Sequence, residues 1–317
     1  MTLVSNDPSW WPFINSNIFN NYWIVAAAFV VVYDWVLTLG EEIELIWTQR
    51  WSLMTVLYLV IRYVGISYSA ANILGTTTLV SLTDAVSNIV NYAVNGTNVV
   101  VAAMLGVIMM ARLHAMYQRS RRMLIFLVII FLAANIACGV ITIIGLKYDF
   151  VLEEVILYGI HMCADGSERD SQLLISMVWM LNTVWEVLAL CLSVWIAAKH
   201  FRDLRRLGPW TGSTIGDCFR VLMESHVLYF ASFAGVSCLQ LVTLSPEVEN
   251  QFDSVAVEIF DGVFEILFSV QMFVLGPRLI LSVRQYHAKL VAESDAETSM
   301  NSIFFQERVH VPTSSTV

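Results

Sequence analysis

Charged side chains are scarce in this chain, which has 317 residues and only 14% Asp, Glu, Lys and Arg. Apolar residues make up 57% of it and the mean hydropathy is +0.68, whereas soluble domains average roughly 45–50% apolar and about 25% charged residues. This composition excludes an ordinary soluble enzyme, and it excludes a disordered chain, which needs low hydrophobicity and high charge. The net charge of −9 argues against a nucleic-acid partner.

Proline and cysteine are also few, with six and five residues respectively. Only Pro277 touches a predicted helix, whereas helices broken by proline or glycine are typical of transporters. No spacing of cysteine and histidine matches a zinc site, so we expect neither a metal nor a cofactor. The one cluster that includes a histidine is Glu224, Ser225 and His226, and neighbours on a helix point in different directions. We therefore expect no catalytic site.

Long apolar blocks account for the composition. A bilayer core about 30 Å thick needs roughly 20 mostly apolar residues in a helix, and seven blocks of this kind follow one another. The predicted fold is an all-α bundle of seven transmembrane helices over residues 22–286, preceded by an outer N-terminal segment, 1–21, and followed by a disordered cytoplasmic tail, 287–317. We expect the helices at 22–40, 51–74, 92–111, 123–146, 172–198, 221–244 and 254–277.

The outer start of the third helix is the boundary that the sequence defines least. Residues 75–98 are apolar but rich in Thr, Ser and Asn. Arg112 fixes the inner end, and counting back about 20 residues starts the helix near Tyr92, which leaves 78–91 as a short outer helix or loop. The glycosylation sequon Asn95-Gly96-Thr97 then falls at or inside the outer leaflet, so we expect it to be unmodified.

Lys and Arg gather on one side of these blocks, and this asymmetry predicts the orientation. Such residues are enriched in the cytoplasmic segments of multi-pass proteins. With the N-terminus outside, the inner segments hold 14 of the 17 Lys and Arg, and the outer segments hold two. We expect an integral protein of the plasma membrane or an internal membrane, whose inner basic segments contact anionic lipid headgroups. A cytoplasmic partner would bind at 199–220 and the tail.

Ionisable side chains inside a membrane are costly and therefore face the bundle interior or pair with one another. Asp34 lies in the inner half of the first predicted helix, and Arg62 lies at mid-depth in the second. Their difference in height is a few residues at 1.5 Å each, which an Arg side chain can reach. An ion pair between Asp34 and Arg62 is the simplest way to neutralise both, and we expect it to act as a structural clamp.

A second group of polar side chains lies in the middle and outer parts of the predicted helices. Glu258 shares a face of the seventh helix with two further acidic residues, and Asn91 begins a similar stripe on the third. These side chains either form interhelical hydrogen bonds worth roughly 0.6–2 kcal/mol each or line a cavity open to the outside. Such a cavity would suit a cation or a polar cationic ligand, and it would be wet, because carboxylates without basic partners become protonated in a dry one. The candidate pocket residues are Asn95, Asn98, Asn182, Glu186, Gln240, Asp261 and Glu265.

Residues 33–63, YDWVLTLGEEIELIWTQRWSLMTVLYLVIRY, carry a distinctive set of aromatic, acidic and basic positions. They are Tyr33-Asp34, Leu37-Thr38, Glu42, Ile46-Trp47, Trp51, Leu57-Tyr58 and Arg62-Tyr63. With this signature, at about 22–66, the chain resembles a large family of multi-pass membrane proteins from mushroom-forming fungi, the basidiomycetes, that carries domain of unknown function 6533. Segments 111–121, 224–230 and 274–284 are similar to the same family, which often has Arg-Asp where Met223-Glu224 stand here. The resemblance implies a seven-helix integral membrane protein and implies no activity.

The helix count, the orientation, the basic inner segments and the polar tail favour a receptor-like, non-enzymatic protein. Against this interpretation, no Asp-Arg-Tyr follows the third helix, and the seventh has Leu275-Gly276-Pro277-Arg278 in place of Asn-Pro-x-x-Tyr. The alternative is a transporter or channel for a cation or small polar solute, although the chain shows no repeat of its two halves. An intramembrane enzyme needs a metal cluster or a nucleophile with a positioned base, and the sequence indicates neither.

Overall fold

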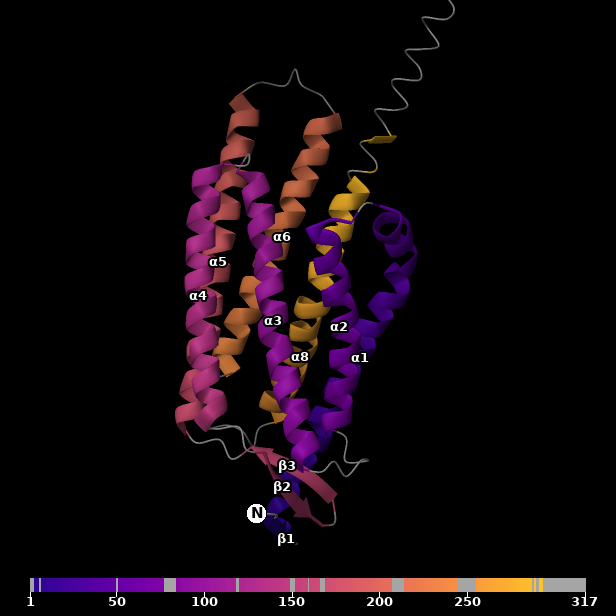
Figure 1. The fold of residues 1–317 in the computed structure, drawn as a ribbon, viewed down its shortest axis with the longest axis vertical. Coiled ribbons are helices and arrows are strands. Elements are labelled where there is room, and N and C mark those ends of the chain that lie inside the picture. Colours follow the sequence, from indigo (N-terminus) through magenta and orange to yellow (C-terminus); the bar gives the residue numbers. More distant parts are fainter. Residues whose placement is uncertain are drawn as a thin grey trace, which may run out of the picture.

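The computed structural model describes residues 3–5, 7–49, 51–76, 84–117, 120–148, 152–158, 160–165, 169–206, 214–243 and 255–286, together with 288, 291 and 292. Most of the expected tail 287–317, and residues 207–213 of the expected partner segment, lie outside these ranges. Within the described ranges the chain forms one bundle of seven long helices (Figure 1). They are α1 (Trp11–Glu42), α2 (Leu53–Thr76), α3 (Asp84–Met116), α4 (Arg121–Tyr148), α5 (Arg169–Arg206), α6 (Thr214–Thr243) and α8 (Val255–Val270).

The helical bundle is confirmed, and six of its helical runs are long and apolar enough to cross a membrane, which is consistent with the expected multi-pass protein. They are α1 to α5 and the helical run Val255–Tyr286 that begins with α8. The described part of α6 contributes a shorter apolar helix, Val227–Val242. Figure 1 shows the first helix starting at one end of the bundle and the run Val255–Tyr286 finishing at the opposite end.

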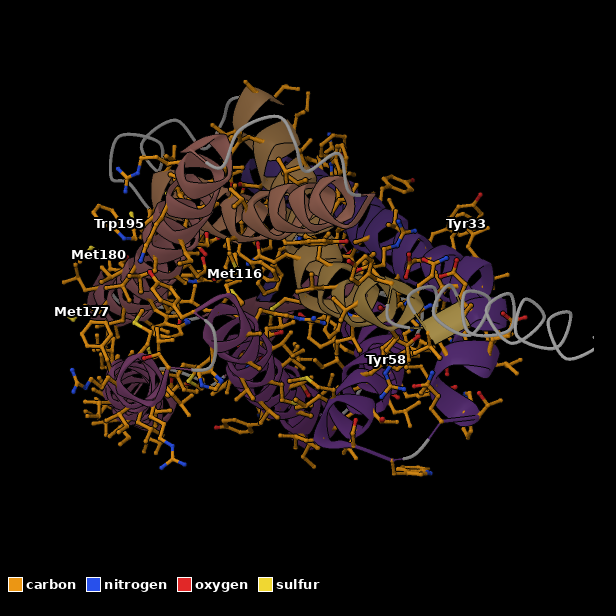
Figure 2. The ribbon with its side chains drawn as sticks, turned by 90° about the horizontal axis from the view of Figure 1, so that it is seen from above. Tyr33, Tyr58, Met116, Met177, Met180 and Trp195 are labelled. Carbon is orange, nitrogen blue, oxygen red and sulfur yellow. The ribbon has the colours of Figure 1, made fainter. Side chains whose placement is uncertain are left out.

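Large apolar side chains lie on the outside of the bundle as well as in its core. Tyr58 is 0% exposed in the core, whereas Trp195 is 69% exposed. Figure 2 shows Trp195, Met177 and Met180 on the periphery of the bundle. Large apolar side chains in such numbers on the outside of a helical bundle indicate a lipid environment, because lipid tails solvate them and water does not.

The first helix starts earlier than its apolar block. It begins at Trp11, so much of the expected separate segment 1–21 is helical. A short 3-10 helix, η1 (Pro8–Trp10), leads into it, and the Asp7 side chain accepts a hydrogen bond from the Ser9 N–H at 2.9 Å. This hydrogen bond holds the pKa of Asp7 below its ordinary value, because it favours the ionised carboxylate.

The third helix is continuous from Asp84, so the expectation of a separate short helix or loop over 78–91 was wrong for its described part, 84–91. A polar side chain can stay within this helix by bonding to the helix backbone. The Asn95 side-chain amide, for example, donates to the Asn91 carbonyl at 3.0 Å. A side chain that bonds four residues back satisfies its polar group without leaving the helix.

The last helical run changes its winding in the middle. A π-helical turn, η3 (Gln271–Leu275), follows α8, and helix then continues to Tyr286, beyond the predicted end at 277. The turn ends two residues before Pro277, which has no N–H to donate and whose ring crowds the carbonyl four residues earlier. Proline and π-turns are the common causes of such irregularities, and π-turns are frequent at functional sites.

A small sheet extends the predicted all-α fold. Strand β1 (Leu3–Ser5) pairs in parallel with β2 (Leu152–Leu157), and β2 pairs antiparallel with β3 (Ile160–Asp165). The sheet lies at the end of the bundle where α1 starts (Figure 1), and β2 contacts α3. The ring of Trp11 packs against Tyr158, in the turn between β2 and β3, with 4.9 Å between centroids. The sheet therefore ties the N-terminus to the connection between α4 and α5.

Two glycines allow neighbouring helices to approach closely. A Cβ atom on Gly262 of α8 would overlap the ring of Trp23 of α1, and one on Gly106 of α3 would overlap the ring of Phe131 of α4. Small residues at helix contacts are typical of membrane bundles, where close packing takes the place of the hydrophobic effect. Gly106 thereby places the Phe131 ring beside the cavity described next.

Candidate functional site

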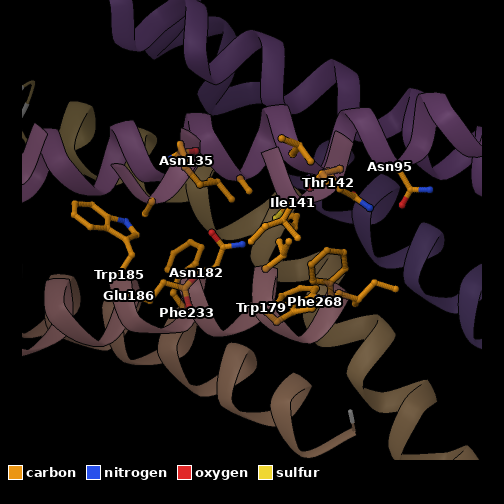
Figure 3. A pocket seen from close by; sticks show the side chains of 18 of the residues that line it. Asn95, Asn135, Ile141, Thr142, Trp179, Asn182, Trp185, Glu186, Phe233 and Phe268 are labelled. Atoms are coloured by element: carbon orange, nitrogen blue, oxygen red, sulfur yellow. The ribbon is translucent and has the colours of Figure 1, made fainter. Parts of the chain in front are cut away.

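A cavity of about 290 Å³ lies inside the bundle, between α3, α4, α5, α6 and the run Val255–Tyr286 (Figure 3). Sites for small molecules enclose roughly 300–1,000 Å³, so this volume suits a small ligand. Of the seven predicted pocket residues, Asn95, Asn98, Asn182 and Glu186 line the cavity. The structure therefore brings together polar residues from α3 and α5 that are some ninety positions apart in the chain.

Glu186 is the acidic residue of the lining. It is buried, and the Ser237 hydroxyl of α6 donates a hydrogen bond to its Oε2 at 2.5 Å. None of the described residues that line the cavity is Lys, Arg or His, and the described part of the chain forms no ion pair with Glu186. The carboxyl group thus faces the cavity with one hydrogen-bond donor and without a compensating cation among the described residues.

Three further polar atoms of the lining residues are buried and lack a hydrogen-bond partner among the described residues. They are Asn98 Oδ1, Trp185 Nε1 and Gln271 Oε1. Gln271 is 4% exposed and Trp185 is 6% exposed. A buried polar atom left unpaired destabilises a protein by about 1–3 kcal/mol, so several of them around one space indicate that something else pairs with them.

Aromatic rings form much of the cavity wall. Phe131 of α4 lies 5.3 Å from Trp185 of α5, and Trp179 of α5 meets Phe268 of α8 edge-on at 5.7 Å, both measured between ring centroids. Figure 3 shows Trp179, Asn182, Trp185 and Glu186 presented by the same stretch of α5. A helix places residues three and four apart on one face, which is why one segment of α5 supplies both rings and polar groups.

The structure does not bring Gln240, Asp261 or Glu265 into this lining. Glu265 lies within electrostatic range of the phenol of Tyr68 in α2, and its helix presents Gly262 to α1. The cavity meets the same run further along the chain, through Phe268, Gln271 and Met272. The acidic residues of the stripe on the seventh predicted helix are therefore not part of the lining.

Gln271 and Trp185 line the cavity although the sequence did not predict them there. Gln271 interrupts the apolar stretch that runs from Ile266 of α8 into η3, where it is a buried amide next to Met272 and Phe273. A lone glutamine in such a stretch is the signal that could have identified it, because a buried amide needs partners. Trp185 carried no such signal, since tryptophan is common in membrane helices.

A second polar cluster lies nearer the other end of the bundle, around Asp34 of α1. Arg62 of α2 donates from Nη1 to Asp34 Oδ2 at 2.5 Å and from Nη2 to the Asp34 carbonyl at 3.0 Å, and it also contacts Thr38. Asp34 and Arg62 are both buried. The two residues expected to pair are therefore joined by an ion pair, and their role as a clamp stays a prediction.

Glu42 completes this cluster, although it was expected to lie beyond the first helix. It is 0% exposed and accepts hydrogen bonds from the hydroxyls of Tyr58 and Tyr63, at 3.2 and 3.0 Å, and from Trp47 Nε1 at 3.1 Å. Its Oε2 lies 3.9 Å from Arg62 Nε. The missed signal is the spacing of Asp34, Thr38 and Glu42, which puts all three on one helix face.

Three arginines connect the last helical run to neighbouring elements at this end of the bundle. Arg278 donates from Nε to Asp34 Oδ1 at 2.6 Å. Arg284 donates to the Leu45 carbonyl at 2.7 Å, and Arg112 of α3 donates to the Leu279 carbonyl at 3.1 Å. The ion pair and the hydrogen bonds to backbone carbonyls fix the position of this end of the last helical run relative to the helices beside it.

In the described part of the chain, no group of three or more His, Cys, Asp and Glu side chains is arranged to hold a metal ion. A comparison with curated proteins finds no match to the chain. The family comparison instead points to the first helical hairpin, where every member of the Asp34 cluster except Arg278 lies. Residues 22–67, which form most of α1, the turn η2 (Ile43–Trp47) and the first part of α2, match the sequence model of a family of unknown function (DUF6533).

Proposed function

We propose that this chain is a receptor-like, non-enzymatic seven-helix membrane protein that binds a small molecule in the cavity between α3, α4, α5, α6 and the last helical run. One observation carries the proposal: Glu186 and three polar atoms that lack a partner among the described residues border one cavity with aromatic walls. A bound molecule would supply the missing hydrogen-bond partners. Thr142 is the hydroxyl-bearing residue of the described lining, and it donates to the Cys138 carbonyl at 2.8 Å, which supports binding over nucleophilic catalysis.

The proposed orientation has the N-terminus outside and the basic end in the cytoplasm. The excess of Lys and Arg in alternate segments supports it. The described basic residues at the inner end include Arg112, Arg121, Arg202 and Arg284, whereas the sheet lies at the other end. In this orientation the cavity lies on the side of the bundle nearer the outside, because its lining reaches Gly145 and Leu174, next to the connection that carries β2 and β3.

A cytoplasmic partner surface at 199–220 and the tail belongs to the same proposal. Helix α5 has 38 residues, and at 1.5 Å per residue it is about 57 Å long, well beyond the roughly 30 Å core of a bilayer. Its apolar span ends at Lys199, and Arg202 beyond it is exposed. This projecting end is suited to contact anionic headgroups or to bind a cytoplasmic protein.

The test is a search for stabilising small molecules with the purified protein in lipid nanodiscs. Neighbouring alanines of α4 provide matched variants, because Ala134 lines the cavity and Ala133 is exposed on the outside. A compound that binds in the cavity should raise the melting temperature of the wild type and of Ala133→Phe, and should leave Ala134→Phe unchanged. If every stabilising compound acts equally on both variants, the cavity is not the binding site.

A transporter or channel for a cation or small polar solute is the alternative. Glu186 favours it, because a carboxyl group inside a membrane often marks an ion pathway. Flux of ions or labelled solutes into liposomes distinguishes the two functions. Flux through the wild-type protein that Glu186→Gln abolishes would contradict the receptor-like proposal, whereas ligand binding without flux would support it.

A further inference from the structure

Among the buried lining atoms that lack a partner in the described part of the chain, two are acceptors of hydrogen bonds and one is a donor. Asn98 Oδ1 on α3 and Gln271 Oε1 in η3 are buried acceptors without a partner among the described residues, and the carboxyl group of Glu186 is a third acceptor. Trp185 Nε1 is the donor among the unpaired atoms. Such a lining is matched by a ligand that is rich in donors, and an ammonium group offers three of them.

The lining offers such a ligand one acidic partner, Glu186, and no competing cation among its described residues. Glu186 is only 9% exposed, and no described lining residue carries a positive charge. An isolated carboxylate in an apolar interior is strongly unfavourable unless it is paired. Ser237 supplies one hydrogen bond to it and leaves the other carboxyl oxygen for a ligand.

The walls favour an organic cation over a bare metal ion. Four of the aromatic residues, Phe131, Trp179, Trp185 and Phe268, surround the space. Aromatic rings attract an organic cation through their negative faces and exclude the water that a small inorganic ion would keep. A volume of about 290 Å³ limits the ligand to a small molecule with one charged head and a compact apolar body.

We infer that the cavity takes an organic monocation, an ammonium head on an aromatic or aliphatic body, with Glu186 as its counterion and Asn98 and Gln271 as further acceptors. This inference rests on the proposed function, because it names the class of ligand that the same cavity binds. The acceptors come from α3, α5 and η3, so a bound ligand would contact three separate elements of the bundle.

The test compares three probes that share one body. They are phenylbutylamine, which is an ammonium ion at neutral pH, phenylbutanol and phenylbutyrate. Binding to the protein in nanodiscs is measured by calorimetry, and the heat of partition into empty nanodiscs is subtracted. We expect the wild type to bind the ammonium at least about tenfold more tightly than the alcohol, as a charge-assisted pair worth about 1.4 kcal/mol would give, and to bind the carboxylate more weakly than both.

Two variants separate charge from shape. Glu186→Gln keeps a group that can accept from Ser237 and removes the charge, so it should abolish the preference for the ammonium and leave the alcohol affinity within about twofold. Gln271→Leu should weaken the ammonium a few-fold, because it removes one acceptor and no charge. The comparison among the three probes in the wild type needs no variant to fold, so it is decisive even if Glu186→Gln is unstable.

Each outcome decides the inference. Equal or tighter binding of the alcohol, blocked by Ala134→Phe, would overturn the cationic ligand and preserve the cavity as a binding site. An ammonium preference that Glu186→Gln leaves unchanged would overturn Glu186 as the counterion. Failure of all three probes to bind would overturn the inference, and only failure of the wider search for cavity ligands would overturn the proposed function.

Discussion

Arg278 and Asp34 lie 244 residues apart in the chain, and the Arg278 Nε donates to Asp34 Oδ1 at 2.6 Å. Asp34 also accepts from Arg62, so a single carboxylate holds α1, α2 and the last helical run together. The two arginines differ in environment, because the side chain of Arg278 is 47% exposed and that of Arg62 is 2% exposed. The clamp expected between two helices is therefore a contact among three.

Loss of Asp34 should destabilise the protein far more than loss of Arg278. Asp34→Asn leaves the buried Arg62 without its main counter-charge, which costs about 3–5 kcal/mol for a buried pair. Arg278→Gln breaks a contact that is half open to the surroundings, which is worth about 0–1 kcal/mol. Melting temperatures of the two variants in the same detergent provide the comparison, and equal temperatures would contradict the central role of Asp34.

A charge exchange tests the three-way contact directly. The double variant Asp34→Arg with Arg62→Asp restores the pair between α1 and α2, but it places an arginine beside Arg278 and an aspartate near Glu42. We expect this double variant to remain less stable than the wild type, and the addition of Arg278→Glu to recover part of the loss, because opposite charges then meet at both contacts. A double variant as stable as the wild type would show that Arg278 does not contribute.

The two tyrosines bound to Glu42 should differ in their contribution. Tyr58 is 0% exposed and Tyr63 is 40% exposed, and each hydroxyl donates to one oxygen of Glu42. Tyr58→Phe removes a donor from a buried carboxylate and should lower stability by about 1.5–3 kcal/mol, the range for hydrogen bonds to charged groups. Tyr63→Phe should lower it by less, since lipid headgroups or water can replace an exposed donor; the reverse order would contradict this account of the cluster.

Close helix packing predicts opposite effects for two glycine substitutions. Gly262→Ala puts a methyl group against the Trp23 ring and should separate α1 from α8, whereas a Cβ on Gly139 of α4 meets nothing within 4 Å. Gly139→Ala should therefore leave stability unchanged or raise it by about 0.5–1 kcal/mol, the helix preference of Ala over Gly. Thermal unfolding of both variants checks the contrast, and a harmless Gly262→Ala would show that the two helices are less tightly packed.

Glycosylation tests the depth of α3 and the orientation together. The Asn95 amide donates to the Asn91 carbonyl and side chain within a continuous helix, so we expect no glycan at Asn95 in a eukaryotic expression host. Pro8→Thr creates a second sequon at Asn6 in the N-terminal segment, and this one should be modified if the N-terminus is outside. A glycan on the wild type that is lost in Asn95→Gln would contradict the depth assigned to α3. If the Pro8→Thr variant carries no glycan at Asn6, the proposed orientation is contradicted.

The sequence contained most of the fold, because each membrane helix is a long apolar block whose length is set by the bilayer. It did not contain the helix ends, since helices such as α1 and α5 extend beyond the apolar region that marks them. It also missed the sheet, because β2 and β3 are short and lie in a connection with several acidic residues. Strand pairing with β1, some 150 positions away, leaves no local pattern.

The sequence predicted several of the residues that line the cavity, but it predicted less well which helices those residues face. The spacing of residues three or four apart identifies those that share a helix face. It grouped Asn182 with Glu186 and Asn95 with Asn98, and all four line the cavity. It does not say which neighbour that face meets, so Glu265 was assigned to the cavity although it is near Tyr68 of α2. Gln271 enters the lining through a π-helical turn, a departure from regular winding that spacing alone does not reveal.

Cryo-electron microscopy of the protein in lipid nanodiscs, at a resolution that shows side chains, is the most direct test of the cavity. We predict a cavity bordered by Asn98, Glu186 and Gln271 that no protein side chain fills. The cavity is either empty or holds non-protein density next to the Glu186 carboxyl group. A bundle in which aromatic side chains fill that space, with these three residues hydrogen-bonded to one another or to the backbone, would contradict the cavity and the function proposed for it.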